Sequence, residues 1–480
     1  MYDTRDQQTD DIQKLLRKIQ SLLARHRLVE NLVHRQHMPR QELVDHLVHK
    51  QNLSELQKLL DRLHAADIAF ILEGLPIEDR LLIWEMVQSR HDGEILLEVS
   101  DAVRESLIGA MADSEIKAAA ETLNVDELAD LAPDLPPEIM QDVFSSLEPE
   151  ERAQVHAAMS YAEDTVGALM DFDMVTVRED VTIKVVLRYL RRFEELPEHT
   201  DKIFVVDRDQ HLQGILTLET LLTSQPKTPV SEVMKSKNII SFEPNDDADD
   251  AAQAFERYDL ISAPVVDSDR RVIGRLTVVD IVDYVREESD YEILGNAGLR
   301  EGEDIFASVW DSVKNRWVWL AINMGTAIFA SRVIGAFENS IAQLVALAAL
   351  MPIVAGMGGN SGNQTITMIV RAIAMGQVEQ SALHRLLRKE IGVALINGLI
   401  WGSLLGAMAW LLYDNLPLGL VMTAATILNL LLAASAGVLI PMIRTRFGRD
   451  PALGGSVMIT GLTDSGGFFI FLGLATIFLL

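Results

Sequence analysis

The sequence predicts a multidomain membrane protein: an acidic all-α N-terminal domain, a tandem pair of α/β domains, an acidic connecting helix and a domain of five transmembrane helices. Three observations lead to this fold class. Short helical segments fill residues 41–160, a repeat with an offset of 60 residues occupies 165–285, and five long apolar segments follow Lys314. With 480 residues, the chain is long enough for several domains.

Charge divides the chain in the same way. The formal net charge is −28: residues 1–316 carry 64 acidic and 34 basic side chains, whereas residues 317–480 carry 6 and 8. The polyanionic first part repels nucleic acid and suits cations or basic partners. The absence of cysteine excludes disulfides and thiolate-bound metals. The charged N-terminus has no apolar core, so it does not have the pattern of a secretory signal.

Each apolar segment reaches the roughly 20 residues that cross a bilayer as a helix. One such segment is often a buried helix of a soluble protein, but five in succession favour a lipid bilayer as the partner. We expect the spans at 317–337, 341–370, 391–413, 416–443 and 453–480.

Basic residues predict the orientation of these spans. They gather before the first span, between the second and third, and between the fourth and fifth, whereas the opposite loops hold Glu338 and Asp414. Cytoplasmic loops are enriched in Lys and Arg. We therefore expect a multi-pass protein of the cytoplasmic (inner) membrane, with its N-terminus in the cytoplasm and its C-terminus outside.

Helical periodicity predicts the acidic N-terminal domain. Residues 11–35 place apolar side chains at helical spacing without proline, which predicts one amphipathic helix. Residues 41–160 continue as short helices in a loosely repeated array. Pro76, Pro137 and Pro149 each precede acidic residues, a pattern typical of the first turn of a helix.

The repeat predicts two similar α/β units. VVDRDQHLQGILTLETLL begins at Val205 and VVDSDRRVIGRLTVVDIV at Val265. Each predicts strand, turn, strand and helix, preceded by a further strand and helix. The pair resembles tandem cystathionine-β-synthase (CBS) domains, and this resemblance places Thr277 and Asp280 in a nucleotide-ribose motif. The first copy has Thr220 where Asp280 would fall, so a single nucleotide pocket and a purely structural pair both stay open.

One carboxylate lies inside the last span. Asp464, in GLTDSGG, is the only ionisable side chain after Pro451. An acid within the bilayer is costly unless it faces protein or water, so it is a functional candidate by default. Gly461, Gly466 and Gly467 allow close backbone approach, and their carbonyls would help the carboxylate to hold a cation. The alternative is a protonated Asp in a hydrogen bond between packed helices.

The second span contains a polar stretch, PIVAGMGGNSGNQ, from Pro352 to Gln364. Proline, glycine and asparagine are poor helix formers, so we expect non-helical backbone here, which at that depth is tolerated only inside protein or against water. Tight packing through glycine alone is the alternative, but it does not explain the amides. The residues expected at the pore ion are Asp464, Asn360, Gly358, Gly359 and Gly467.

These ligands are all oxygen atoms. His384 is the only histidine in the membrane part, and it lies in a predicted cytoplasmic loop. Hard cations prefer oxygen, whereas zinc, nickel and copper usually recruit imidazole or sulfur. Mg²⁺ keeps several of its waters, so one carboxylate beside a hydrated ion fits Mg²⁺ better than a full cage does.

Acidic clusters in the cytoplasmic part are the third signal. A solvated face is the usual interpretation of any one cluster, but like charges this close oppose compaction unless cations bridge them. Residues 281–313, which lead to the first span, are strongly acidic and predicted to be helical on either side of Gly295–Gly298. The clusters comprise Asp246, Asp247, Asp249 and Asp250; Asp280, Asp283, Glu287, Glu288 and Asp290; and the pair Asp126 and Asp130.

The order of these parts and both membrane motifs resemble the MgtE family of magnesium channels and transporters. PIVAGMGGNSGNQ and DPALGGSVMITGLTDSGG match its membrane motifs, and LHAADIAFILEGLPIEDR at 63–80 looks like its N-terminal domain. The resemblance covers about 50–480, and residues 1–40 look like an extension. It implies a homodimeric Mg²⁺ channel whose pore ion is held by the carboxylate of the last span, here Asp464.

The resemblance also implies cytosolic acids that bind Mg²⁺ and close the pore when the ion is abundant. Some members bind ATP between the CBS copies, which Thr277 and Asp280 allow here. The matching regulatory positions are Asp247, Asp249, Asp259, Asp280 and Asp283, with Asp126, Asp130, Asp450, Glu287, Glu288 and Asp290 as further positions.

The expected domain boundaries follow from these patterns. They are an extension at 1–40, the acidic helical domain at 41–163, CBS domains at 164–228 and 229–287, a connecting, plug-like helix at 288–314, and the transmembrane domain at 315–480.

We expect a Mg²⁺-selective channel that cytosolic Mg²⁺ closes, and no enzyme, because no hydrolase or transferase constellation and no GxxxxGK[ST] loop is visible. The alternative is an ion-coupled secondary transporter of Mg²⁺ or of another divalent metal such as Co²⁺ or Mn²⁺. An anion channel regulated by CBS domains is disfavoured by Asp464 and by the lack of a basic residue deep in a span. A nucleotide-sensing receptor would leave the polar stretch of the second span unexplained.

Overall fold

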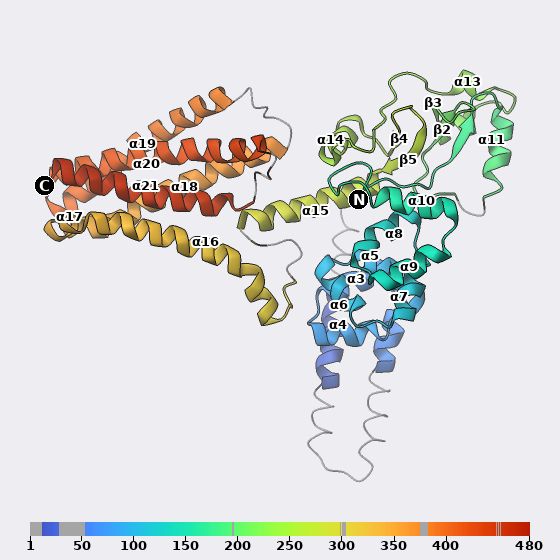
Figure 1. Ribbon diagram of the computed structural model, residues 1–480, viewed down its shortest axis with the longest axis horizontal. Coiled ribbons are helices and arrows are strands. Elements are labelled where there is room, and N and C mark those ends of the chain that lie inside the picture. Colours follow the sequence, from blue (N-terminus) through green and yellow to red (C-terminus); the bar gives the residue numbers. More distant parts are fainter. Residues whose placement is uncertain are drawn as a thin grey trace, which may run out of the picture. The chain divides into compact units, whose positions relative to one another are not determined.

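A computed structural model describes residues 12–27, 53–193, 196–297, 299, 304–374, 383–447, 449, 451 and 453–480. The chain divides into two compact units. The first comprises Met1–Tyr284 and Asp304–Ser308, and the second comprises Val285–Glu303 and Val309–Leu480. Figure 1 traces the elements of both along the chain.

The first unit begins with an array of short helices on one apolar core. Helices over residues 12–27 and 53–60 contribute Ile19, Leu23 and Leu56, each at most 1% exposed, to this core. The helix predicted over 11–35 is confirmed for 12–27, and the rest of that range lies outside the described residues. The array continues with α3 (Ala65–Glu73), α4 (Ile77–Trp84), η1 (Ser89–His91), α5 (Asp92–Glu98), α6 (Asp101–Ile108), α7 (Asp113–Ala120), α8 (Val125–Leu131), η2 (Ala132–Asp134), α9 (Pro137–Ser146) and α10 (Pro149–Ala158).

Some of the acidic residues of this array lie at the starts of its helices. Pro76 is the N-cap of α4, and Pro137 and Pro149 lie in the first turns of α9 and α10, as predicted. Side chains at the third helical position also cap their own helices. Glu115 and Glu127 accept the backbone N–H of the N-cap residue at 2.9 and 2.8 Å.

The α/β repeat follows in the same unit. Its first copy contains β1 (Thr176–Arg178), α11 (Ile183–Leu190), β2 (Lys202–Val206), β3 (Leu212–Thr217), α12 (Leu218–Thr223) and α13 (Val230–Val233). Its second contains α14 (Ala248–Tyr258), β4 (Ser262–Val266), β5 (Val272–Thr277) and the start of α15 (Val278–Ala297). Strand β2 pairs in parallel with β1 and antiparallel with β3, and β4 pairs antiparallel with β5.

The strand predicted at the start of the second copy is wrong in extent. In the described residues it is reduced to one parallel bridge, between Phe242 and Val265. Pro244 follows two residues later and cannot donate to a sheet, which explains why the pairing stops. Backbone bonds between the copies, such as Leu212 N–H to Arg270 O at 3.0 Å, hold the pair together.

The second unit consists of long helices. They are α16 (Val309–Ala336), α17 (Glu338–Gln343), α18 (Ala346–Ala374), α19 (Leu383–Tyr413), α20 (Leu416–Arg446) and α21 (Gly455–Phe478) (Figure 1). In the described part of the chain, four helical segments are long and apolar enough to cross a membrane: Ser312–Ala336, Leu383–Tyr413, Leu416–Arg446 and Gly455–Phe478. Helix α18, which has 29 residues and covers most of the predicted second span, is not among these four.

The non-helical backbone predicted in the second span is wrong. Helix α18 runs unbroken through Pro352 and the whole of PIVAGMGGNSGNQ. Propensities measured in water do not transfer here, because in a bilayer a broken helix leaves backbone groups without hydrogen bonds. Glycine costs less in such a helix when its missing side chain lets a neighbouring helix approach. In the connecting segment we predicted helix on either side of Gly295–Gly298. Helix α15 continues through Gly295 and ends at Ala297.

Asp92 makes the stability of the helical array depend on pH. Burial, reinforced by the charge of Glu115, raises the pKa of Asp92 to about 6, against about 3.9 in an unfolded chain. The folded array therefore prefers the protonated acid, and the stability from this group is present below about pH 4 and lost as the pH rises through 6.

We predict that Asp92→Asn stabilises the array by up to about 2–3 kcal/mol at pH 8 and by much less at pH 4. The change in stability is measured by hydrogen exchange of the α5 amides in the full chain. The quantity compared is the ratio of the wild-type exchange rate to the variant rate at each pH. Asp113→Asn, which changes an exposed acid of α7, is the control and should leave the ratio near one. Equal protection of wild type and Asp92→Asn at pH 8 would contradict the prediction.

Candidate functional site

Asp464 lies in the middle of α21 and is half-buried. Its chain neighbours Thr463 and Ser465, which point to either side of it on the helix, are buried. The Thr463 hydroxyl lies 3.6 Å from where a Cβ on Gly359 of α18 would stand. No described residue forms an ion pair or hydrogen bond with the Asp464 carboxylate. The carboxylate oxygens are therefore available to a cation.

Asn429 of α20 lies at a contact between α18, α20 and α21. Its side chain is fully buried, and its Nδ2 donates to Val354 O of α18 at 2.9 Å. A Cβ on Gly358 of α18 would stand 2.2 Å from that nitrogen, and one on Gly467 of α21 would stand 2.7 Å from it. Both glycines thus leave the space that the amide fills. In the described part of the chain, Asn429 Oδ1 has no hydrogen-bond partner.

The predicted pore residues therefore lie in two settings. Gly358, Gly359 and Gly467 are buried at helix contacts, and because their helices are continuous, their carbonyls belong to helical hydrogen-bond ladders. Asn360 is exposed in this chain. The side-chain oxygens of Asp464 and Asn360 have no partner in the part of the chain that the structure describes, so they are the candidate ligands among these five. All five assignments stay predictions.

Two buried polar residues of the membrane part were missed by the sequence reasoning. Asn429 stands in an ordinary apolar run, and only the glycines of two other helices reveal its position. Glu390, near the start of α19, is buried and accepts a hydrogen bond from Thr365 of α18 at 3.4 Å. In the sequence Glu390 directly follows the basic stretch RLLRK, which indicates a charged loop and hides its burial. Its Oε1 lies 3.3 Å from Lys389 Nζ.

In the first unit, Asp126 on α8, Asp171 before β1 and Asp280 on α15 are partly buried, and the charge of Asp171 acts on both of the other carboxyls. Burial, and then the charge of Asp171, raise the pKa of Asp126 to about 7. Burial raises the pKa of Asp280 to about 6, against hydrogen bonds from Thr277. Asp171 pairs with Arg275 at 2.7 Å, yet its burial keeps its pKa raised. We call Asp126, Asp171 and Asp280 the buried acid group.

The donor set of the buried acid group fits a hard divalent cation. It consists of carboxylates only, and Arg275 supplies one positive charge for three acids. Carboxylates that repel one another in a desolvated place are stabilised when a cation joins them. Asp171 was missed because it stands alone in LMDFDM, and only the fold brings it to the other two.

The acids at the start of α14 have a local structural role. Asp247 is the N-cap, and its Oδ1 accepts the Asp249 N–H at 2.9 Å. Asp249 also accepts a hydrogen bond from the Tyr284 hydroxyl of α15 at 3.2 Å, and burial, together with the charge of Asp247, raises its pKa. Asp259 ends the helix in the left-handed conformation, with φ of 51°.

The other predicted regulatory acids lie on α15 and α8. Asp450 lies outside the described residues, and the metal roles of all these acids stay predictions. Exposed positions are Asp130 on α8 and Asp283, Glu287 and Asp290 on α15, and Glu288 on α15 is half-buried.

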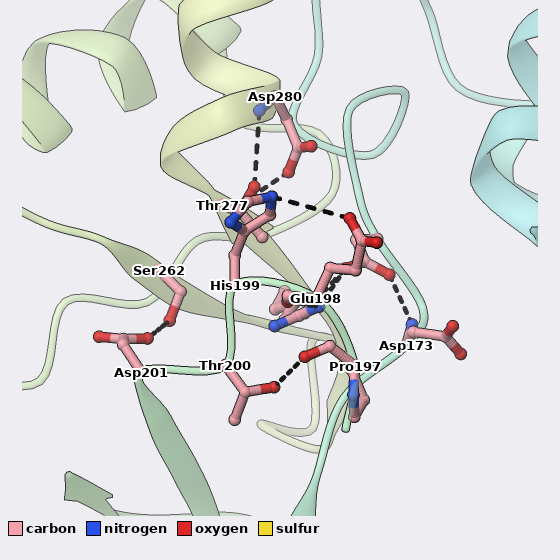
Figure 2. A network of polar contacts seen from close by, with 11 residues as sticks. Asp173, Pro197, Glu198, His199, Thr200, Asp201, Ser262, Thr277 and Asp280 are labelled. Atoms are coloured by element: carbon pink, nitrogen blue, oxygen red, sulfur yellow. Dashed lines mark hydrogen bonds and ion pairs between the residues drawn. The ribbon is translucent and has the colours of Figure 1, made fainter. Parts of the chain in front are cut away.

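Thr277 and Asp280, the proposed nucleotide pair, form a helix cap. The Thr277 N–H donates to Asp280 Oδ2 at 2.8 Å, and the Asp280 N–H donates to Thr277 Oγ1 at 3.5 Å. Figure 2 shows this pair beside the Asp201–Ser262 hydrogen bond that joins the two CBS copies. The first copy caps its helix α12 through Thr217 in the same way. Capping therefore accounts for these residues without a nucleotide.

One group in the described residues brings three possible metal ligands within 4.8 Å: Asp207, Asp209 and His211. It lies in the turn between β2 and β3, where Asp207 Oδ1 accepts the N–H groups of Asp209 and His211 at 2.8 and 3.0 Å. Turn formation alone accounts for this arrangement. None of the predicted regulatory acids forms a group this tight in the described part of the chain.

Family models match most of the chain. Residues 351–474 match the divalent cation transporter MgtE, residues 63–164 match the MgtE intracellular N domain, and residues 166–227 and 230–287 match CBS domains.

Among curated proteins, the magnesium transporter MgtE of Thermus thermophilus is 31% identical over 433 residues, which cover 88% of this chain and 95% of that protein. The magnesium transporter MgtE of Bacillus subtilis is 26% identical over 429 residues, which cover 89% and 94%. Among solved structures, the cytosolic domain of the Mg²⁺ channel MgtE in complex with ATP is 29% identical with a TM-score of 0.45, and the match covers 50% of this chain and 97% of that domain.

The contact between Gly358 and Asn429 can be tested by steric substitution. Gly358→Ala places a methyl group against the Asn429 amide, and overpacking of this kind costs about 1–3 kcal/mol. We predict a lower unfolding temperature of the full chain in detergent, and recovery when Asn429→Ala is added, because the second change vacates the space.

Gly356→Ala is the matched control two residues away. A Cβ there meets nothing within 4 Å, so the unfolding temperature should stay the same or rise slightly. Equal effects of the two glycine substitutions would rule out the close contact.

Proposed function

The chain belongs to the MgtE family of divalent cation transporters, and we propose that it is a Mg²⁺ channel of the cytoplasmic membrane that cytosolic Mg²⁺ closes. Family membership makes it a transport protein for divalent cations rather than an enzyme. Its apolar helices make it a membrane protein. Homodimer formation, with a cytoplasmic N-terminus and an external C-terminus, belongs to the proposal.

The observation that carries the proposal is the Asp464 carboxylate within α21, which has no ion-pair or hydrogen-bond partner among the described residues. An acid at this depth attracts a cation, and its half-buried position leaves room for an ion that keeps some of its waters. The contact around Asn429 holds α18 and α21 together next to it, which gives the carboxylate a defined place. Asn360 offers a second, neutral oxygen.

Gating follows from linkage. Mg²⁺ biases the gate only if it binds the closed arrangement more tightly than the open one. The buried acid group supplies such a difference, because its carboxylates come from α8 of the helical array, from the segment before β1 and from α15. A cation that joins them draws these parts together, and without it their repulsion favours separation.

An ion-coupled secondary transporter for Mg²⁺, Co²⁺ or Mn²⁺ is the alternative. It would also use an intramembrane acid, so the distinction rests on flux and not on geometry. ATP at the CBS pair is a further part of the proposal, through Thr277 and Asp280. Because these two residues already cap α15, ATP would have to compete with or build on that cap.

Neutralising the pore carboxylate tests conduction. We predict that Asp464→Asn lowers Mg²⁺ flux into liposomes that contain the purified chain by about 100-fold or more, because one charge contact in a poorly solvated site contributes roughly 3–4 kcal/mol. Asp414→Asn, which changes an acid between α19 and α20 in a left-handed conformation that Asn also adopts, should leave flux unchanged. Normal flux through Asp464→Asn would refute the pore assignment.

Neutralising the buried acid group tests regulation. We predict that Asp126→Asn combined with Asp280→Asn raises the internal Mg²⁺ needed for half-inhibition at least about fivefold, which corresponds to a coupling of roughly 1 kcal/mol. The Asn side chain at 280 still accepts the Thr277 N–H, so the helix cap is kept. Asp113→Asn in the same array is the control, and flux at low internal Mg²⁺ should match wild type in all variants. Retained inhibition would count against the buried acid group as the sensor.

A further inference from the structure

Arg80 on α4 is a permanent charge with no exposed surface. Its Nε donates to Leu72 O at 3.0 Å, and its Nη2 donates to Leu75 O at 3.1 Å, so two carbonyls of the array orient the guanidinium. Its Nη1 donates to the Ser106 hydroxyl at 3.3 Å. These groups are neutral, and a buried guanidinium is stable only when an anion also pairs with it. The anion is Asp304, whose Oδ2 lies 2.8 Å from Nη1 and whose side chain is 8% exposed.

The array contains an internal comparison for this arrangement. Arg104, 24 residues after Arg80, donates to Leu96 O at 2.7 Å and to Val99 O at 3.2 Å, which are the counterparts of Leu72 and Leu75. Its carboxylate partners are Asp134 at 3.0 Å and Asp101 at 3.3 Å, both from the array itself. For Arg80, in contrast, the carboxylate comes from 224 residues later in the chain. The two carbonyls and Ser106 thus form a socket around Arg80 that a carboxylate from outside the array fills.

The segment that fills the socket has a defined local structure. Asp304 Oδ1 accepts the Phe306 N–H at 2.8 Å, and the Ala307 N–H donates to Asp304 O at 3.0 Å. Both carboxylate oxygens are therefore used, one for the turn and one for Arg80. Residues 304–308 belong to the first unit, and α16, the first predicted membrane helix, begins at the next residue, Val309.

We propose that the Arg80 socket is a docking site for residues 304–308, and that it attaches the helical array to the start of α16. This inference rests on the proposed function, in which Mg²⁺ changes how the array is held. With the segment docked, any displacement of the array pulls on the first residues of α16. The docking contact is then a route by which Mg²⁺ bound in the cytosolic part reaches the membrane helices.

Asp304→Asn in the full chain tests the docking, because it removes the charge and keeps an oxygen for the Phe306 N–H. We expect the amides of residues 306–308 to exchange hydrogen at least tenfold faster than in wild type. Half-inhibition of flux should need at least threefold more internal Mg²⁺, with flux at low internal Mg²⁺ unchanged. Asp134→Asn is the matched control: it breaks the equivalent pair within the array and should change neither the exchange of residues 306–308 nor the inhibition.

Ala307→Pro is the second variant. It is needed if Asp304→Asn also speeds hydrogen exchange in α4, because the array itself would then be disturbed. Ala307→Pro removes the N–H that closes the turn and leaves the Arg80–Asp304 pair in place, and we expect smaller changes in the same direction. The docking role would be overturned if the amides of residues 306 and 307 were unprotected in wild type. It would also be overturned if the variants exchanged faster while inhibition of flux by internal Mg²⁺ stayed unchanged. A wild-type chain that conducts no Mg²⁺ would refute the proposed function instead, while its hydrogen exchange would still decide whether the segment is docked.

Discussion

Asn429 of α20 lies against Gly358 of α18 and Gly467 of α21, so three membrane helices meet at its side chain. Its amide hydrogen-bonds to α18 at 2.9 Å and fills the space left by the missing side chains of Gly358 and Gly467. Between helices in a bilayer the hydrophobic effect gives little attraction, so close packing and hydrogen bonds hold them together. Thr463, the residue before Asp464, lies near Gly359, which follows Gly358 in α18. The position of the one acid in the last span therefore depends on how tightly these helices pack.

A different constraint governs the cytosolic part, where acids outnumber bases by 64 to 34 in residues 1–316. Some of this charge is used locally, at helix starts such as that of α14, where Asp247 is the N-cap. Buried arginines offset some of it, as Arg275 does for Asp171 and Arg80 for Asp304. Asp126 and Asp280 are partly buried acids with raised pKa values, and neither forms an ion pair with an arginine among the described residues. A divalent cation is the natural complement of such a group.

Features that follow from local pattern were predictable from the sequence. The long apolar helices, the 60-residue repeat and the acidic start of α14 each depend on neighbouring residues and on periodicity. The continuity of α18 was not predictable in this way, because helix propensity in water ranks glycine and proline against it, whereas the membrane and the packing of α20 and α21 favour it. Asn429, Glu390 and Asp171 were missed for a related reason. Their roles come from partners on other elements, and nothing in their own flanking residues marks them.

The reversal potential of single-channel currents in a planar bilayer tests most directly whether the chain is a Mg²⁺ channel. For a passive pore selective for a divalent cation, it should shift by about 30 mV for each tenfold change in the Mg²⁺ gradient. It should not change when a proton or sodium gradient is imposed. A reversal potential that follows either of those gradients, or Mg²⁺ flux without resolvable single-channel currents, would contradict the channel and favour a coupled transporter.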